Sequence, residues 1–96
     1  SYKVKIGASS IEGRGLIATA DIAEDEVICP ARIGGMRTPA GRFTNHSACP
    51  NARMTAFNGD LFLVALCQID GCRGGTDGEE ITVDYRDSIK ANKELT

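Results

Sequence analysis

Arg42-Phe-Thr-Asn-His-Ser-Ala-Cys-Pro-Asn51 and Gly78-Glu-Glu-Ile-Thr-Val-Asp-Tyr85 are the two segments that decide how this 96-residue chain is interpreted. Taken alone, the first is typical of a loop and the second of a turn that leads into a strand. Gly13-Arg14-Gly15 adds a third turn signal nearer the start of the chain. Three motifs in a fixed order are much harder to obtain by chance than one.

Length and composition indicate one globular domain over residues 1–96. Apolar residues make up 42% and charged residues 25% of the chain, as in ordinary soluble proteins. The net charge of −2 argues against direct binding of nucleic acid, which needs clustered Lys and Arg, and permits an acidic groove for a basic peptide. The longest apolar run, Leu61 to Cys67, is far below the ~20 residues of a membrane span. We therefore expect an intracellular protein, cytoplasmic in its own cell or in a host cell, that is neither secreted nor bound to a membrane.

The four cysteines and the single histidine do not form a metal-binding pattern. Cys29, Cys49, Cys67 and Cys72 contain no C-x-x-C pair, and His46 stands apart from them. We expect reduced, partly buried thiols, with no metal site and no disulfide.

Short strands and turns account for most of the sequence. Alternating apolar and charged residues predict strands at 2–6 and 80–83, an apolar segment follows Gly15, and a strand over 26–29 should stop at Pro30. Asn58-Gly59 between two apolar runs predicts a hairpin with a type I′ turn. Residues 33–41 and 70–78 are expected to be loops.

Long helices are not predicted. Ser88 is a candidate cap for a short helix through Leu95, although fraying is equally compatible with the sequence. Without crossover helices, a doubly wound nucleotide-binding fold is excluded, and the fold class is mainly β.

The three motifs together resemble the SET domain, a family of S-adenosylmethionine-dependent protein lysine methyltransferases. The resemblance runs from about residue 6 to residue 85, and leaves 86–96 as a short tail. Ala48 stands where the family usually has a cysteine, with Cys49 displaced by one position. The resemblance implies a SET fold of short strands in small sheets with a C-terminal pseudoknot, in which the Asn-His segment threads near the last strand. The chain resembles the minimal SET proteins of viruses and bacteria.

The resemblance also implies a binding site for S-adenosyl-L-methionine. Backbone atoms of Gly13, Arg14 and Gly15 would lie against its methionine part, because glycine permits a close approach. Asn45 would hold the amino acid moiety, and the backbone of His46 would recognise the adenine. The other residues assigned to the cofactor are Phe43 and Tyr85.

Tyr85 occupies the place of the family's catalytic tyrosine. Its hydroxyl would lie beside the transferring methyl group, while Thr82, Val83 and Asp84 would contact the substrate, a lysine of a histone or another basic protein. Glu79 and Glu80 are not an acid and base pair, because neighbours in a strand point to opposite faces.

One segment departs from the family pattern. Residues 31–41 stand where a longer insert usually forms a wall of the substrate groove and supplies a second tyrosine, but they contain no aromatic residue. A homodimer partner could complete the groove. The alternatives are a degenerate module that binds cofactor or peptide without turnover, and a structural protein that retains only the fold.

Overall fold

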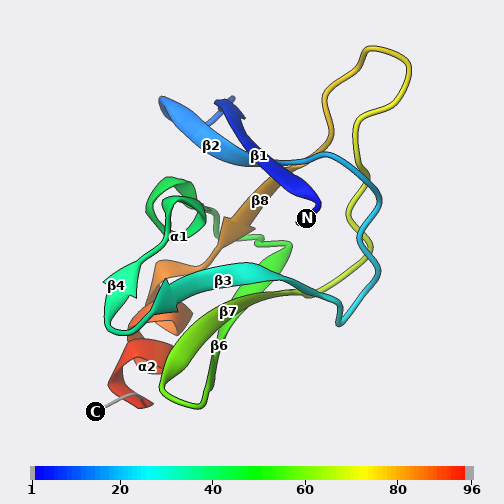
Figure 1. Cartoon of the computed structure of the whole chain (residues 1–96). Helices are drawn as coiled ribbons and strands as arrows, with labels where there is room; N and C mark the ends of the chain where they lie inside the picture. Colours follow the sequence, from blue (N-terminus) through cyan, green and yellow to red (C-terminus); the bar gives the residue numbers. More distant parts are fainter. Residues whose placement is uncertain (1, 95–96) are drawn as a thin grey trace.

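Eight strands and two helices make up the part of the chain that the computed structural model describes, residues 2–94. Figure 1 shows β1 and β2 above the longer strands β3, β6 and β7, with α1, β4 and α2 along one side of the molecule. None of the described helices is long and apolar enough to cross a bilayer. In chain order the elements are β1 (Val4–Ala8), β2 (Arg14–Ala18), β3 (Val27–Ile33), β4 (Met36–Arg37), α1 (Pro39–Phe43), β5 (Asn45–His46), β6 (Ala52–Phe57), β7 (Asp60–Ala65), β8 (Glu80–Val83) and α2 (Tyr85–Glu94).

The first sheet has the strand order β1-β2-β8-β5 and brings distant segments together. β1 and β2 form a hairpin, and β8 pairs antiparallel with β2 through Leu16 and Ile81. The short strand β5 pairs parallel with β8, with Asn45 opposite Thr82. The Asn-His segment therefore lies beside the last strand, as the resemblance implies. The threading of a pseudoknot stays a prediction.

The second sheet has the order β4-β3-β7-β6 and contains the predicted hairpin. β6 and β7 pair over six residues, from Ala52 opposite Ala65 to Phe57 opposite Asp60. Asn58 and Gly59 both have positive φ, 50° and 82°, as a type I′ turn requires. The hairpin prediction is confirmed.

One buried hydrophobic cluster joins the two sheets. Leu16, Ile81 and Val83 come from the first sheet, and Leu61 and Leu63 from the second; each is at most 1% exposed. Because a domain of this size buries only about three fifths of its unfolded surface, these few contacts carry much of the folding free energy.

The prediction of a strand that stops at Pro30 is wrong. β3 continues to Ile33, with Pro30 opposite Phe62 of β7. The register shifts between Pro30 and Arg32, and proline is tolerated at such an irregularity because no ladder donor is needed there.

The prediction of a loop over 33–41 is wrong as well. Gly34 and Gly35, with φ of 58° and 79°, form a tight turn between β3 and β4. The signal was available, since Gly-Gly between two strand-like runs is a hairpin signature. Thr38 then caps α1 by accepting a hydrogen bond from the Gly41 N–H (3.1 Å).

α2 begins at Tyr85, three residues before the predicted cap, and includes part of the expected tail. Asp84 Oδ1 accepts from the Arg86 N–H (2.9 Å), so Asp84 acts at the helix start, while Ser88 lies inside the helix and donates to the Asp84 carbonyl. The predicted end at Leu95 lies outside the described residues.

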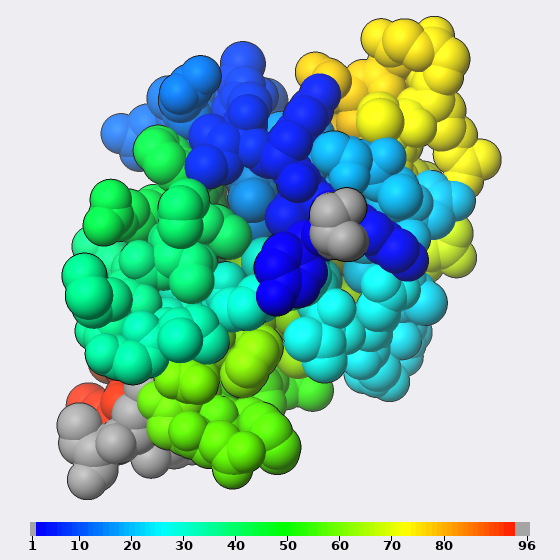
Figure 2. Space-filling model, in the orientation of Figure 1, coloured from blue at the N-terminus to red at the C-terminus, as the bar shows by residue number. Residues whose placement is uncertain are grey.

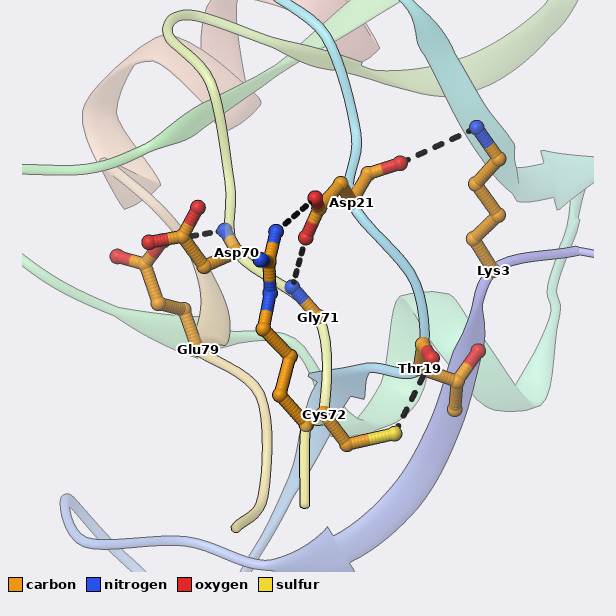
Figure 3. Close-up of polar contacts among 8 residues, drawn as sticks. Lys3, Thr19, Asp21, Asp70, Gly71, Cys72 and Glu79 are labelled. Carbon is orange, nitrogen blue, oxygen red and sulfur yellow. Dashed lines mark hydrogen bonds and ion pairs between the residues drawn. The ribbon is translucent and has the colours of Figure 1, made fainter.

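Residues 70–79 form the expected loop, which stands out from the body as a yellow arm in Figure 2. Asp21 connects the base of this arm to the body, because its carboxylate accepts a hydrogen bond from the Gly71 N–H (3.0 Å; Figure 3). The same carboxylate forms an ion pair with Arg73. The hydrogen bond from Gly71 and the nearby Arg73 charge lower the pKa of Asp21. Cys72 Sγ donates to the Thr19 carbonyl (3.1 Å). The arm is thus attached at its base through polar contacts.

We expect Asn51→Ala to lower the free energy of unfolding by about 2 kcal/mol. The Asn51 amide donates to the Glu80 carbonyl (2.8 Å) and accepts from the Thr82 N–H (2.8 Å), so its loss leaves two backbone groups of β8 unpaired. Urea denaturation measures the change. Gln68→Ala, which removes an exposed amide, should be neutral. Equal stability of the two variants would contradict the role given to Asn51.

Candidate functional site

The turn before β2 is held against β5 by one side chain. Asn45 Nδ2 lies 3.0 Å from Ser9 Oγ, 3.2 Å from the Glu12 carbonyl and 2.8 Å from Glu80 Oε2. Its two N–H groups are shared among these acceptors. Arg14 and Gly15 are the first residues of β2, and the structure brings them and the turn at Gly13 next to Asn45, as the resemblance implies. The Asn45 N–H₂ group is thereby bonded to the chain itself.

Glu80 completes this group from β8. Its carboxylate accepts from Ser9 Oγ at 2.7 and 2.8 Å, in addition to the bond from Asn45. A Cβ on Gly15 would lie 2.4 Å from Glu80 Oε2, so a larger residue here would displace the Glu80 carboxylate from Ser9 and Asn45. Glu79 instead accepts from the Asp70 N–H at the base of the arm. The two carboxylates have separate partners, which agrees with the prediction that they are not an acid and base pair.

Tyr85 is held at three points at the start of α2. Its N–H donates to His46 Nδ1 (3.1 Å), its hydroxyl donates to the Thr44 carbonyl (3.2 Å), and the two rings lie 5.0 Å apart. Because Nδ1 accepts, the neutral His46 ring carries its proton on Nε2. Tyr85 is still 48% exposed, so its ring is positioned by the chain and remains accessible.

A cleft of about 340 Å³ opens beside Tyr85, between α1, the second sheet and α2. Its volume is at the lower end of the range for ligand sites. Gly13, Arg14, Gly15, Asn45 and His46 do not line it, whereas Tyr85 lines the cleft and also contacts His46. The lining residues are Ala31, Arg32, Arg37, Gly41, Arg42, Thr44, Met54, Leu61, Tyr85, Ser88, Ile89 and Asn92.

The remaining predicted site residues lie elsewhere. Phe43 is half-buried at the end of α1 and does not line the cleft. Thr82 and Val83 are 7% and 1% exposed, and the Thr82 N–H is paired with Asn51. The structure thus does not bring their side chains to a surface where a substrate could touch them. Asp84 caps α2.

The cysteines are placed as ordinary thiols. Burial raises the pKa of Cys29 to about 11, so this thiol stays protonated at neutral pH and is a poor nucleophile and metal ligand. The other three are exposed. Residues 2–94 contain no group of three or more potential metal ligands.

Sequence reasoning missed Ser9, Glu80 and the arginines of the cleft as site residues. No local signal marks Ser9, because its partner Glu80 is 71 positions away. The arginines could have been found, since Arg32 and Arg37 flank the Gly-Gly hairpin signal.

Glu80→Gln should lower the free energy of unfolding by about 1–2 kcal/mol. The new amide N–H₂ would face either the Ser9 hydroxyl or the Asn45 amide, where the structure needs an acceptor. Thermal and urea denaturation measure the effect. Glu24→Gln, at an exposed position, is the matched control. A wild-type stability for Glu80→Gln would show that the carboxylate does not hold the turn.

Comparisons with known proteins bear on the fold. Neither a known protein family nor a curated protein matches the sequence. Among solved structures, the chain is similar to a proposed histone methyltransferase of Plasmodium falciparum, with 22% identity and a TM-score of 0.64 over 88% of this chain and 94% of that one. Likeness at this identity shows a shared fold. It confirms the predicted mainly β, SET-type fold of short strands in small sheets.

Proposed function

We propose that this domain transfers a methyl group from S-adenosyl-L-methionine to the ε-amine of a lysine in a protein substrate. The observation that carries the proposal is the position of Tyr85, which is bonded to His46 and Thr44 on either side of Asn45 in sequence and also lines the cleft. A methyltransferase of this kind has to hold the cofactor and the substrate amine on either side of the methyl group that is transferred. The fold shared with the Plasmodium falciparum protein supports the same activity.

The turn before β2 fits the cofactor. A Cβ built on Gly13 meets no atom within 4 Å, so this face of the turn is open to a ligand. Arg14 is exposed, and its guanidinium has no hydrogen bond or ion pair to the described residues, which leaves it available for a carboxylate. His46 is exposed beside Asn45. When bound, the cofactor would supply an activated methyl group.

The chain's own contribution is to hold the amine in its reactive state. A lysine with a pKa of ~10.4 costs about 4–5 kcal/mol to deprotonate at pH 7. Met54, Leu61 and Ile89 give the cleft apolar walls, and removal of water from an ammonium group favours its neutral form. Tyr85 Oη is anchored on Thr44, so the ring keeps one orientation at the mouth of the cleft.

One observation favours a second candidate, a module that binds cofactor or peptide without turnover. Tyr85 is the only aromatic residue among those that line the cleft within residues 2–94. A single aromatic ring would therefore orient the lysine amine in the cleft. A partner protomer could supply further aromatic residues to its walls.

Arg14→Gln should weaken binding of S-adenosylmethionine about tenfold, because it removes a charged hydrogen-bond donor, and should leave unfolding unchanged. Titration calorimetry measures the affinity. Arg14 is a cleaner choice than Asn45, whose amide also holds Ser9 and Glu80. Arg53→Gln on β6 serves as the control with the same change of charge. No heat of binding at millimolar cofactor would refute the methyltransferase and the module that binds cofactor, and would leave only a module that binds peptide.

Tyr85→Phe should preserve cofactor affinity and slow methylation of protein lysines at least tenfold, because the bond that orients the ring is lost. Incorporation of labelled methyl groups into a cell lysate provides the measurement. Tyr2→Phe, at an exposed tyrosine, should behave as wild type. Cofactor binding by the wild type without any labelled protein would favour the module without turnover.

A further inference from the structure

Two arginines face each other across the short hairpin of β3 and β4. Arg32 and Arg37 are register partners, and both line the cleft beside Tyr85. Arg42 of α1 lines the same cleft. Like charges directly opposite each other in a sheet are destabilising, so this arrangement costs stability unless an anion offsets it.

The described residues provide no such anion. Arg37 and Arg42 form no side-chain hydrogen bond or ion pair within residues 2–94. Arg32 donates from Nη1 to the Gly35 carbonyl (2.8 Å), but its Nε is buried without an acceptor. A buried donor without a partner is costly and rare in native proteins. None of the residues that line the cleft is Asp or Glu.

We propose that this cleft binds the carboxylate side chain of an Asp or Glu that flanks the target lysine in the protein substrate. That the substrate contains a target lysine rests on the proposed function. That an acidic residue flanks this lysine rests on the three arginines of the cleft. Guanidinium groups match carboxylates through paired N–H donors. Thr44, Ser88 and Asn92 add polar groups to the lining, and the apolar walls suit the stem of a side chain.

The charge of the cleft favours a substrate with acidic residues over a basic peptide or a nucleic acid. A peptide rich in Lys and Arg would be repelled by three arginines that form no ion pair within residues 2–94, so the cleft does not match the basic substrate expected from the sequence. Nucleic acid is disfavoured because the chain carries 13 acidic and 11 basic residues, and phosphate-backbone binding needs an extended basic surface. A lysine with acidic neighbours brings its own counter-charge into the cleft.

The experiment compares two labelled peptides by fluorescence anisotropy, without cofactor. The peptides are Ala-Glu-Lys-Glu-Ala and its uncharged counterpart Ala-Gln-Lys-Gln-Ala. We expect the first to bind at least tenfold more tightly, and Arg37→Gln and Arg42→Gln to remove this preference. Both arginines are exposed and form no side-chain bonds to the described residues, so the variants should fold. Arg53→Gln is the control, because Arg53 is next to Met54 in β6 and points to the opposite face.

Four results would overturn the inference. These are equal binding of the two peptides, an equal loss of preference in Arg53→Gln, tighter binding of a uridine oligonucleotide that depends on Arg37, and weaker S-adenosylmethionine binding in Arg37→Gln, which would assign the arginines to the cofactor. Cofactor binding without a peptide preference refutes the cleft assignment alone. A peptide preference without cofactor binding refutes the methyltransferase and leaves the carboxylate site standing.

Discussion

The hydrogen bonds formed by the backbone of β8 and by its first side chain, Glu80, hold the rest of the structure together. In the sheet, β8 lies between β2, which pairs with Glu80 and Ile81, and β5, which pairs with Thr82 and Val83. The Asn51 side chain accepts from the Thr82 N–H and donates to the Glu80 carbonyl. The first side chain of β8, Glu80, then draws Ser9 and Asn45 into one hydrogen-bonded group. Because buried backbone groups must be paired, the position of β8 determines the positions of β2, β5 and the segment at Asn51.

This constraint explains why the candidate site has two unlike halves. The half around Asn45 is made of hydrogen bonds within the chain, and a Cβ on Gly15 would displace the Glu80 carboxylate that takes part in them. The half around the cleft is lined by α1, α2 and the second sheet, and its three arginines form no ion pair with the described residues. Tyr85 belongs to both, since its N–H and hydroxyl contact the Asn-His segment while its ring lines the cleft. A rigid frame with an unsatisfied edge is the arrangement expected of a binding site.

Much of this architecture follows from local sequence. Asn58-Gly59 predicts its hairpin because only residues that accept positive φ fit a type I′ turn, and the alternation around Ile81 predicts a strand. The prediction that Asn45 lies near Gly13, Arg14 and Gly15 rested on the resemblance of the motifs to a known family. Local sequence could not provide the partnership of Ser9 and Glu80, which depends on the pairing of β2 with β8. It also misjudged Pro30, because a bulge is visible only when the partner strand is known. The helix start at Tyr85 was missed because Asp84 became a cap through its place at the end of β8.

The link between Ser9 and Glu80 spans 71 positions, and this has a consequence for biosynthesis. At a translation rate of 5–20 residues per second, Ser9 is made on the order of 4–14 s before its acceptor exists. During that interval the β1–β2 hairpin has neither β8 nor Glu80, and a two-stranded hairpin is only marginally stable in water. The nascent chain therefore exposes Leu16 and Ile17 until β8 emerges from the ribosome. In the cell, this domain should depend on chaperones that shield the first hairpin.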